Sequence, residues 1–462
     1  MSNLLFARFH PFCFLFLLLI GKVFVLMFDA KQMLPVIPGG DHIDIVKACL
    51  FSSPYWPRFK RNILIINMRL LRVDDPIEQE EQTRYDKMIC GIGENRAVDG
   101  ILMEIEPLEY DDVFTVSPTE KRFVLTVVPK ENMFVVPAEM KPGELDFDSE
   151  DPVPDPRIAA IKWLHPEGYS PAHAAKFVVL ATTNKSVDEW NDFIGLTNPN
   201  HQHAPLLSKD TFTDVDDVHG HLASMIRDGV LEKYNSNDVP PHKLILKVGD
   251  VCLVMRNLNV SDGITNNTRV VVLHITNTFI RCQTLGDDPV HVILPRIRFN
   301  FRLPYGQSFV MTRLQFPLRR AFALSINKSQ GQTVGGALID ARSGFFAHGQ
   351  QYVGVSRVTH YRSLGLYLTQ NQVWCNTCPS ARPIPMHGKP VLSNIVYPEA
   401  IREIRELTRE YERSLGIDGA LGGLGRDDGD HAGGAASASS SSSSSNRRRR
   451  VNSIEDQENH DY

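Results

Sequence analysis

PLRRAFALSINKSQGQT, at residues 317–333, is the stretch of sequence that decides the fold class. Its apolar segment AFALSI predicts a buried strand, and the small and polar residues after it predict a loop at the strand's carboxyl end. Ligands of α/β proteins bind at that end of the sheet. Amides, hydroxyls and the lysine of such a loop can hold phosphate groups. The stretch therefore predicts an α/β fold with a phosphate-contacting loop.

Other apolar runs predict further strands of the same sheet. They are KFVVLAT (176–182), GALIDA (336–341) and LGLYLT (364–369). A helix is expected after the first of them, with Thr183 or Asn184 as its cap. Towards the C-terminus, the spacing of apolar residues from Pro398 to Leu415 predicts an amphipathic helix.

Residues 243–295 have a different pattern. Short apolar runs such as KLILKVGDVCLVM and TRVVVLHIT are separated by Gly, Asn and Asp. This pattern is typical of short antiparallel strands. It predicts a small all-β module, a barrel inserted into the α/β domain.

The N-terminal segment admits more than one interpretation. The uncharged stretch from Phe9 to Gly21 is shorter than the roughly 20 residues that a membrane span needs. A buried strand from Val23 to Met27 is favoured, followed by a loop at Asp29 and a helix around residues 41–51. A signal peptide or membrane anchor, and an artefactual start of the chain, are the alternatives. No membrane partner is expected.

Composition indicates an ordinary globular protein, with 42% hydrophobic and 22% charged residues among 462. A net charge of −5 means that any nucleic-acid site must be a local patch. Seven cysteines do not indicate a disulfide framework and fit a reducing compartment. Cys375 and Cys378 form a CxxC pair without a second pair, so incidental thiols are favoured over a zinc site.

Charge is distributed unevenly along the chain. Residues 103–155 hold 14 acidic and 4 basic residues, and we interpret them as a surface insertion and linker. Between Val290 and Ile339 there are six arginines and Lys328 but no acidic residue. Some of these arginines will solvate a β-surface, yet the run favours a DNA-facing groove.

A second informative segment is QYVGVSRV, residues 351–358. Arg357 follows an apolar run and is placed to project a single cation. A guanidinium suits a γ-phosphate because it stays charged and makes forked contacts. One arginine alone is ordinarily surface chemistry, so only the combination of segments is specific.

In combination these segments resemble motifs V and VI of the Pif-type DNA helicases, superfamily 1 motors that include the helicase halves of Helitron transposons. Residues 29–60 resemble the family's motif III, and INMRL (66–70) resembles the element after it. LATTNKSVDEWN (180–191) resembles the opening of the second RecA-like domain, and residues 240–272 the small β-barrel insert. The resemblance covers roughly residues 21–370, in the family's order.

The resemblance implies a RecA-like second motor domain with an inserted β-barrel and a remnant of the first motor domain. The segments are then an apolar N-terminal segment (1–20), the first-domain remnant (21–72), an acidic connection (73–156), the second RecA-like domain in two parts (157–235 and 296–370), the barrel insert (236–295), a C-terminal extension with a helix (371–415) and a Ser/Arg tail (416–462).

Residue roles follow from the same resemblance. Gln32 is implied as the motif III glutamine that senses nucleotide, and Arg69 and Arg357 as γ-phosphate ligands, with Arg357 as the arginine finger. Gly331 is implied as a further nucleotide-binding position. The DNA-binding residues implied are Thr182, Asn184, Asn327, Lys328 and Gln330.

The chain also departs from the family. Phe28 to Gln32 read FDAKQ where the family has Gly-Asp-Phe-Arg-Gln, Asn267 replaces a glycine and Ser325 a threonine. No Gly-x4-Gly-Lys-Ser/Thr occurs, and residues 1–20 contain no acidic residue for Mg²⁺. ATP and Mg²⁺ are implied by the family, but we expect a truncated chain without ATPase activity of its own. The alternative is a non-catalytic module that binds single-stranded DNA.

The family implies 5'-to-3' unwinding of DNA, with single strands or DNA junctions as partners. Repair, recombination, telomere maintenance and Helitron transposition share these motifs. Arg447 to Arg450 suit nuclear import, although solvated charge is an equal reading. A nuclear location is therefore expected, with the cytoplasm as the alternative.

Overall fold

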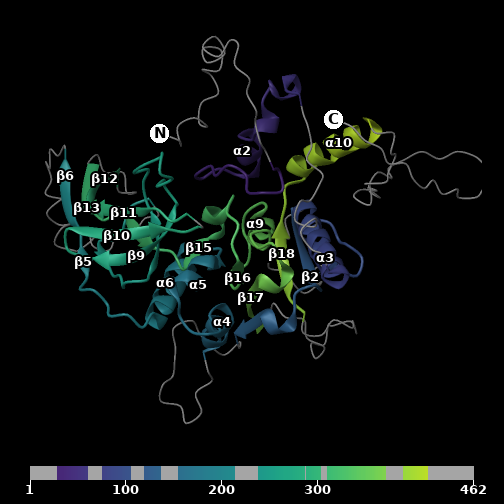
Figure 1. The fold of residues 1–462 in the computed structure, drawn as a ribbon. Helices are drawn as coiled ribbons and strands as arrows, with labels where there is room; N and C mark the ends of the chain where they lie inside the picture. The colour runs from purple at the N-terminus through teal and green to yellow at the C-terminus, as the bar shows by residue number, and fades with distance from the viewer. Residues whose placement is uncertain are drawn as a thin grey trace, which may run out of the picture. The chain divides into compact units, whose positions relative to one another are not determined.

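The computed structural model describes residues 29–60, 75–105, 119–136, 155–213, 238–286, 288–302, 310–370 and 389–414. Their central element is a five-stranded parallel sheet in the order β15-β4-β16-β17-β3 (Figure 1). The strands are β15 (Ala323–Ser325), β4 (Phe177–Ala181), β16 (Gly336–Asp340), β17 (Leu364–Thr369) and β3 (Met133–Val136). Every residue of β16 is buried, as expected for a parallel strand covered on both faces. The α/β class and four of these strands were predicted correctly.

Helices pack on this sheet. They are α4 (Pro156–Leu164), α5 (Pro171–Lys176), α6 (Asn184–Thr197) and α9 (Gln350–Val355). The predicted cap of α6 is confirmed, because Thr183 Oγ1 accepts a hydrogen bond from the backbone N–H of Ser186 at 3.2 Å. Such a cap satisfies one of the N–H groups that a helix leaves unpaired at its start.

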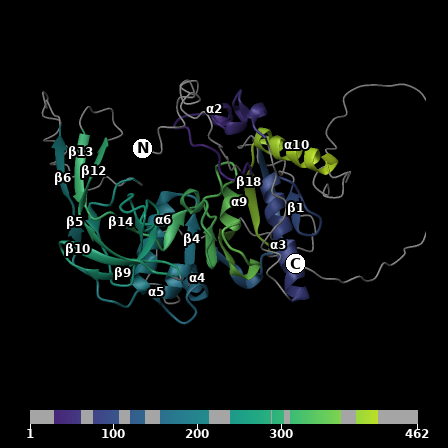
Figure 2. The ribbon, with the colours of Figure 1, turned by 45° about the horizontal axis from the view of Figure 1, so that its top comes forward.

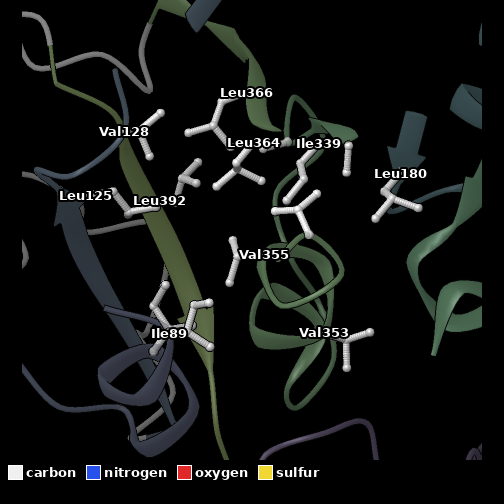
Figure 3. Packing of buried hydrophobic residues seen from close by; sticks show 14 of the residues in the cluster. Ile89, Leu125, Val128, Leu180, Ile339, Val353, Val355, Leu364, Leu366 and Leu392 are labelled. Carbon is white, nitrogen blue, oxygen red and sulfur yellow. The ribbon is translucent and has the colours of Figure 1, made fainter. Parts of the chain in front are cut away.

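The main hydrophobic core joins the sheet to residues that precede it in sequence (Figure 3). Leu180, Ile339 and Leu366 of the sheet share one cluster with Ile89 and Leu125. Ile89 belongs to α3 (Pro76–Glu94). Leu125 belongs to the three-stranded antiparallel sheet of β1 (Leu102–Ile105), β2 (Glu120–Leu125) and β18 (Val391–Ile395). Figures 1 and 2 show α3 beside β18, where Asn394 Nδ2 donates to the carbonyl of Ile92 at 2.7 Å.

The interpretation of residues 103–155 as a surface insertion is therefore wrong for their described part. β1, β2 and β3 come from this stretch, and β3 forms the edge of the parallel sheet. Phe123 and Leu125 are fully buried. A charge count over the whole stretch conceals short apolar runs such as FVLTVV (123–128), which carry the buried positions.

The predicted all-β module is present (Figure 1). Its main sheet has the order β11-β10-β9-β8-β14. The strands are β8 (Val251–Val254), β9 (Arg269–Ile275), β10 (Phe279–Thr284), β11 (His291–Pro295) and β14 (Leu318–Arg320), beside the small pair β5 (Leu206–Leu207) and β7 (Lys243–Leu244). Among the described strands β11 and β14 are the edges of this sheet, and closure into a barrel stays a prediction.

A second antiparallel sheet has the order β12-β13-β6, with β6 (Lys209–Thr213), β12 (Ile297–Arg302) and β13 (Val310–Gln315). The sequence analysis assigned residues 296–315 to the motor domain, whereas these strands pair outside its parallel sheet. The alternation along β12 explains this, because Arg298 and Asn300 are exposed while Phe299 is buried. Such a two-residue period is typical of an antiparallel strand with one face in solvent.

One departure from the family has a backbone explanation. Asn267, where the family has glycine, lies in the left-handed region with φ of 71°. Its N–H donates to the carbonyl of Val254 at 2.8 Å, closing the turn that leads into β9. Asparagine tolerates this conformation better than other non-glycine residues. The turn is therefore kept despite the substitution.

The motif III region forms short elements. The expected helix begins at a capping box on Asp41 and is α2 (His42–Lys47), followed by the short helices η1 (Leu50–Ser52) and η2 (Trp56–Arg58). Ala30, Leu34 and Cys49 are buried with Ala400 of α10 (Pro398–Ser414), which confirms the predicted C-terminal helix. None of the helices in the described ranges is long and apolar enough to cross a membrane. The strand expected at 23–27 lies outside the described residues.

Candidate functional site

The carboxyl ends of β4 and β15 define the candidate site. The two strands pair in parallel, with Ala181 opposite Ser325, so the segments that follow them start side by side. After β4 comes the N-terminus of α6, and after β15 comes the short helix η5 (Ile326–Ser329). We call residues 326–333 the DNA loop. Its position is the edge where α/β sheets bind ligands.

A small hollow lies at this edge. Asn184 and Lys328, which were predicted to bind DNA from sites 144 positions apart, both line it. The remaining lining residues are Val187, Asp188, Leu253, Arg319, Arg320, Ala323, Leu324 and Ser325. Arg319 belongs to the basic run that was expected to face DNA, although it was not singled out among the site residues.

The electrostatics of this hollow favour an anion. Burial, followed by the neighbouring Arg319 guanidinium, lowers the pKa of Lys328, and Asp238 and Asp188 oppose the shift. Arg319 Nη2 lies 3.6 Å from Asp188 Oδ1. Burial raises the pKa of Asp188, which Arg319 counteracts. Two cations close enough to disfavour each other's charge are stabilised by a bound phosphate, which makes charge-assisted hydrogen bonds.

The remaining predicted DNA contacts lie around the hollow. Asn327 and Gln330 are exposed in the DNA loop. Gly331 is exposed with φ of 81°, and nothing lies within 4 Å of the position a Cβ would take. Thr182 is buried, and its hydroxyl has no hydrogen-bond partner in the described structure. The loop thus presents polar side chains and open backbone at one edge.

Arg357 has a different environment from a projecting cation. It follows α9 and is only 6% exposed. Its Nε donates to the carbonyl of Val353 at 2.8 Å, and its Nη2 to Ser356 Oγ at 2.8 Å. Its Nη1 donates to the carbonyls of Gln332 at 3.0 Å and Ser329 at 3.4 Å. The guanidinium therefore binds the DNA loop, and a γ-phosphate role for it stays a prediction.

Motif III lies against the start of α9. Gly349, with φ of 68°, approaches the backbone of Lys31 and Gln32 so closely that a Cβ could not fit. Gln32 Nε2 donates to Asp29 Oδ2 at 2.8 Å, and the hydroxyl of Tyr352 donates to the same oxygen at 3.4 Å. The structure thus brings Gln32 next to the helix that leads to Arg357. Arg69, expected to meet Arg357, lies outside the described residues.

The substituted positions of motif III have their own partners. Ala30 is 1% exposed in a small apolar cluster, and its carbonyl pairs with His348 Nε2 at 2.8 Å. Lys31 Nζ lies 2.6 Å from Glu94 Oε1 at the end of α3. Lysine therefore keeps the positive charge that the family's arginine supplies at this position.

The described residues do not provide a metal site. In the ranges that the structure covers, no three His, Cys, Asp or Glu side chains gather where they could hold an ion. Mg²⁺ therefore has no fitting ligand set there, and we assign no step to it. Cys375 and Cys378 lie outside the described residues.

Comparison with known proteins points to one family. The family model described as PIF1-like helicase matches residues 19–100, and the model described as DNA helicase Pif1, 2B domain, matches residues 230–275. The ATP-dependent DNA helicase PIF1 of Danio rerio is 33% identical over 134 residues, 26% of this chain and 19% of that protein. Human PIF1 is 32% identical over 134 residues, again 26% of this chain and 19% of that protein. The matches thus span a small part of each relative's length.

Solved structures of Pif1 helicases resemble this chain with TM-scores below 0.5. The crystal structure of Pif1 helicase from Candida albicans has a TM-score of 0.45 and 17% identity, covering 82% of this chain and 67% of that chain. A Bacteroides Pif1 bound to single-stranded DNA has a TM-score of 0.32 and 16% identity, covering 52% and 46%. Both family models match in the order expected from the motifs, one around motif III and one in the all-β module. Over these two segments the chain is therefore similar to the Pif1-like DNA helicases.

Proposed function

We propose that this chain supplies the single-stranded-DNA-binding half of a Pif1-type helicase motor. The observation that carries the proposal is the hollow at the carboxyl edge of the sheet, where Asn184, Arg319 and Lys328 meet. They come from two segments of the chain, one around Asn184 and one from Arg319 to Lys328, and an anion is the ligand that their charges favour. DNA phosphates are such anions, and contacts to them carry no base information.

Binding is weak and depends on salt in this proposal. For single strands, the logarithm of the binding constant falls by about 0.7 per phosphate neutralised for each decade of salt. Three to five contacts therefore give a slope of roughly −2 to −3.5. Lys328→Ala removes one cation, so it should weaken binding of all sequences about equally and flatten the slope by roughly 0.7.

Fluorescence anisotropy with a labelled oligonucleotide across a salt series tests this proposal. Lys162→Ala is a matched control, because Lys162 is an exposed lysine of α4 that does not line the hollow. The control should bind like the unmodified chain. Absence of binding near 50 mM salt, or equal behaviour of the two variants, would contradict the proposal.

By family, the motor would unwind DNA in the 5'-to-3' direction with ATP and Mg²⁺. Gln32, Arg69, Arg357 and Gly331 are our proposed nucleotide contacts. The proposed processes are DNA repair, recombination, telomere maintenance or Helitron transposition. The proposed location is the nucleus, with the cytoplasm as the alternative. Single strands and DNA junctions are the proposed partners.

A non-catalytic DNA-binding module is the second candidate. It is favoured by one observation, the absence of Gly-x4-Gly-Lys-Ser/Thr from all 462 residues. Phosphoryl transfer depends on positioning and charge neutralisation that the P-loop provides. We expect no DNA-stimulated phosphate release from the purified 462-residue chain. Release that Arg357→Ala abolishes would reject this candidate.

A further inference from the structure

Arg357 is connected to the DNA loop by more than its side chain. Its guanidinium binds the carbonyls of Ser329 and Gln332 at 3.4 and 3.0 Å. Its own carbonyl accepts from the N–H of Val334 at 3.1 Å, and Val334 forms a parallel bridge with Val358. Arg357 is thus hydrogen-bonded to two residues of the DNA loop and to Val334, which follows the loop.

The loop is oriented by these bonds. Ser329 is 1% exposed, while Asn327, Gln330 and Gly331 of the same loop are exposed. With the carbonyls of Ser329 and Gln332 turned inward onto a cation, their negative ends do not face solvent. In a trans peptide the N–H points away from the C=O, so the N–H of Thr333 points away from the guanidinium. The N–H groups of Gln330 and Gln332 donate within the loop, to the carbonyls of Asn327 and Ser329. Turning the carbonyls of Ser329 and Gln332 inward suits a surface that meets an anionic backbone.

Other bonds of the loop are local. Gln332 Nε2 donates to the carbonyl of Lys328 at 3.1 Å, and Ser329 Oγ donates to the carbonyl of Ile326 at 2.7 Å. They shape the turn but do not attach it to α9. Of the bonds described here, those of Arg357 connect the turn to the helix, so its removal should release the loop while leaving α9 in the core.

We propose that Arg357 is a positioning residue for the DNA loop, so that binding of single-stranded DNA depends on Arg357 in the absence of any nucleotide. This inference rests on the proposed DNA-binding function. In this role Arg357 orients the DNA loop before any nucleotide phosphate is bound. A guanidinium is suited to it because Nη1 holds the two loop carbonyls while Nε and Nη2 bond Val353 and Ser356, a fixed set of contacts that an ammonium on a flexible stem does not make.

Two variants test the inference, measured as affinity for a labelled oligonucleotide without nucleotide. Arg357→Gln removes the charge and Arg357→Lys keeps it but loses the fork, and each should weaken binding by about tenfold, as loss of charge-assisted bonds implies. The salt slope of Arg357→Gln should change by less than about 0.3, well below the roughly 0.7 that a lost phosphate contact gives. A change near 0.7 would mean direct contact with DNA and would overturn the inference.

Two controls separate positioning from general damage. Arg362→Gln removes the same charge from an exposed arginine five positions later and should bind normally. Tyr85→Phe removes the 2.6 Å bond from the Tyr85 hydroxyl to the carbonyl of Val355, on the same helix but away from the loop. It should lower the melting temperature without weakening DNA binding. A tenfold loss of affinity in Tyr85→Phe would show that any disturbance of α9 suffices, which would overturn the inference.

Amide hydrogen exchange separates failure of this inference from failure of the proposed function. In Arg357→Gln without DNA, residues 326–334 should exchange faster, while β16 and β17 keep their protection. If the unmodified chain binds no DNA but this pattern is found, the proposed function fails and the positioning role stands. If the unmodified chain binds DNA and Arg357→Gln binds and exchanges like it, the positioning role fails.

Discussion

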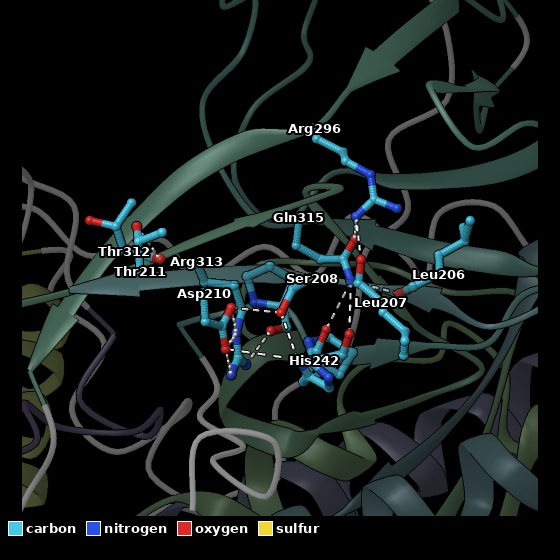
Figure 4. Close-up of polar contacts among 12 residues, drawn as sticks. Leu206, Leu207, Ser208, Asp210, Thr211, His242, Arg296, Thr312, Arg313 and Gln315 are labelled. Carbon is cyan, nitrogen blue, oxygen red and sulfur yellow. Dashed lines mark hydrogen bonds and ion pairs between the residues drawn. The ribbon is translucent and has the colours of Figure 1, made fainter. Parts of the chain in front are cut away.

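Basic residues have opposite environments on the β12-β13-β6 sheet and at the carboxyl edge of the parallel sheet. On the β12-β13-β6 sheet, Arg313 is fully buried and donates to both oxygens of Asp210, with a shortest distance of 2.8 Å (Figure 4). Beside the parallel sheet, Arg319 and Lys328 line the hollow. Both regions draw on one basic run in the sequence. Position at the carboxyl edge of the sheet, rather than the number of arginines, therefore marks the DNA-binding candidate.

The expectation that the basic run forms one DNA-facing groove is thus only partly met. Arg320 Nε lies 3.3 Å from Asp250 and its Nη1 3.3 Å from Asp192. Arg296 donates to Gln315 at 2.9 Å, and Gln315 in turn donates to three carbonyls of the module (Figure 4). The acidic partners Asp192 and Asp250 come from distant segments, which a count of charges along the run does not include.

The largest effect should come from breaking the buried ion pair between Arg313 and Asp210. Asp210→Ala leaves the Arg313 guanidinium buried without its carboxylate, which typically costs about 3–5 kcal/mol of stability. Urea unfolding followed by circular dichroism measures this loss. The double variant with Asp210→Leu and Arg313→Met should recover most of it, because two apolar residues leave no buried charge. A loss below about 1 kcal/mol, the value of an exposed pair, would contradict a buried role.

A second effect, on pH dependence, concerns the contact between motif III and the C-terminal extension. Burial lowers the pKa of His348 to about 4. Its Nδ1 accepts from the N–H of Tyr397 at 2.7 Å, so this nitrogen is unprotonated and protonation breaks the bond. Asp29 and Glu399 raise the pKa of His348, and His42 lowers it. The two carboxylates together have a smaller effect on this pKa than burial.

The sign follows from the lowered pKa. The unfolded chain takes up a proton near the ordinary histidine pKa of about 6.5, before the folded chain does. Stability is therefore complete above that pH and decreases as the pH falls toward 4, by about 2–3 kcal/mol from this residue. His348→Gln should remove this part of the pH dependence between pH 6.5 and 4, measured by urea unfolding at several pH values. An unchanged pH profile in the variant would contradict the assignment.

Sequence reasoning was most successful where signals are local. The strands at 177–181 and 336–340 are continuous apolar runs, and the Thr183 cap lies directly after the first. Helix α3 was not predicted. Its buried positions lie in the same helix as Glu and Lys residues, so the segment as a whole is not an apolar run. The pairing of Arg313 with Asp210 spans 103 positions, which no local pattern reveals.

The candidate site shows the same limit. Asn184 and Lys328 were identified through the family resemblance, and the parallel pairing of β4 with β15 brings them together. For Arg357 the sequence predicted a cation that projects from the surface. The sequence of a short helix followed by arginine does not determine in which direction that side chain points. That direction is decided by the packing of α9 against η5, where inward carbonyls are available.

A smaller effect tests the comparison of the two regions directly. Arg319→Ala in the hollow should weaken binding of single-stranded DNA about fivefold and flatten the salt slope by roughly 0.7. Arg298→Ala removes an exposed arginine of β12 and should leave affinity within about twofold, since it lies on the antiparallel sheet. Anisotropy titrations of both variants measure the difference. Equal losses would mean that the β12-β13-β6 sheet takes part in the DNA track.

The smallest effect concerns Asn267, where the chain departs from the family's glycine. With φ of 71°, a residue with a Cβ is strained, so Asn267→Ala should destabilise the chain by about 1 kcal/mol. Asn267→Gly relieves the strain but makes the unfolded chain more flexible, and these two effects offset each other to within about 0.5 kcal/mol. Urea unfolding measures the stability of the two variants. Neither substitution should change the affinity for DNA, because the turn does not line the hollow. If Asn267→Ala proved as stable as the unmodified chain, a relaxed turn would replace the left-handed one, and the family's glycine at this position would need another explanation.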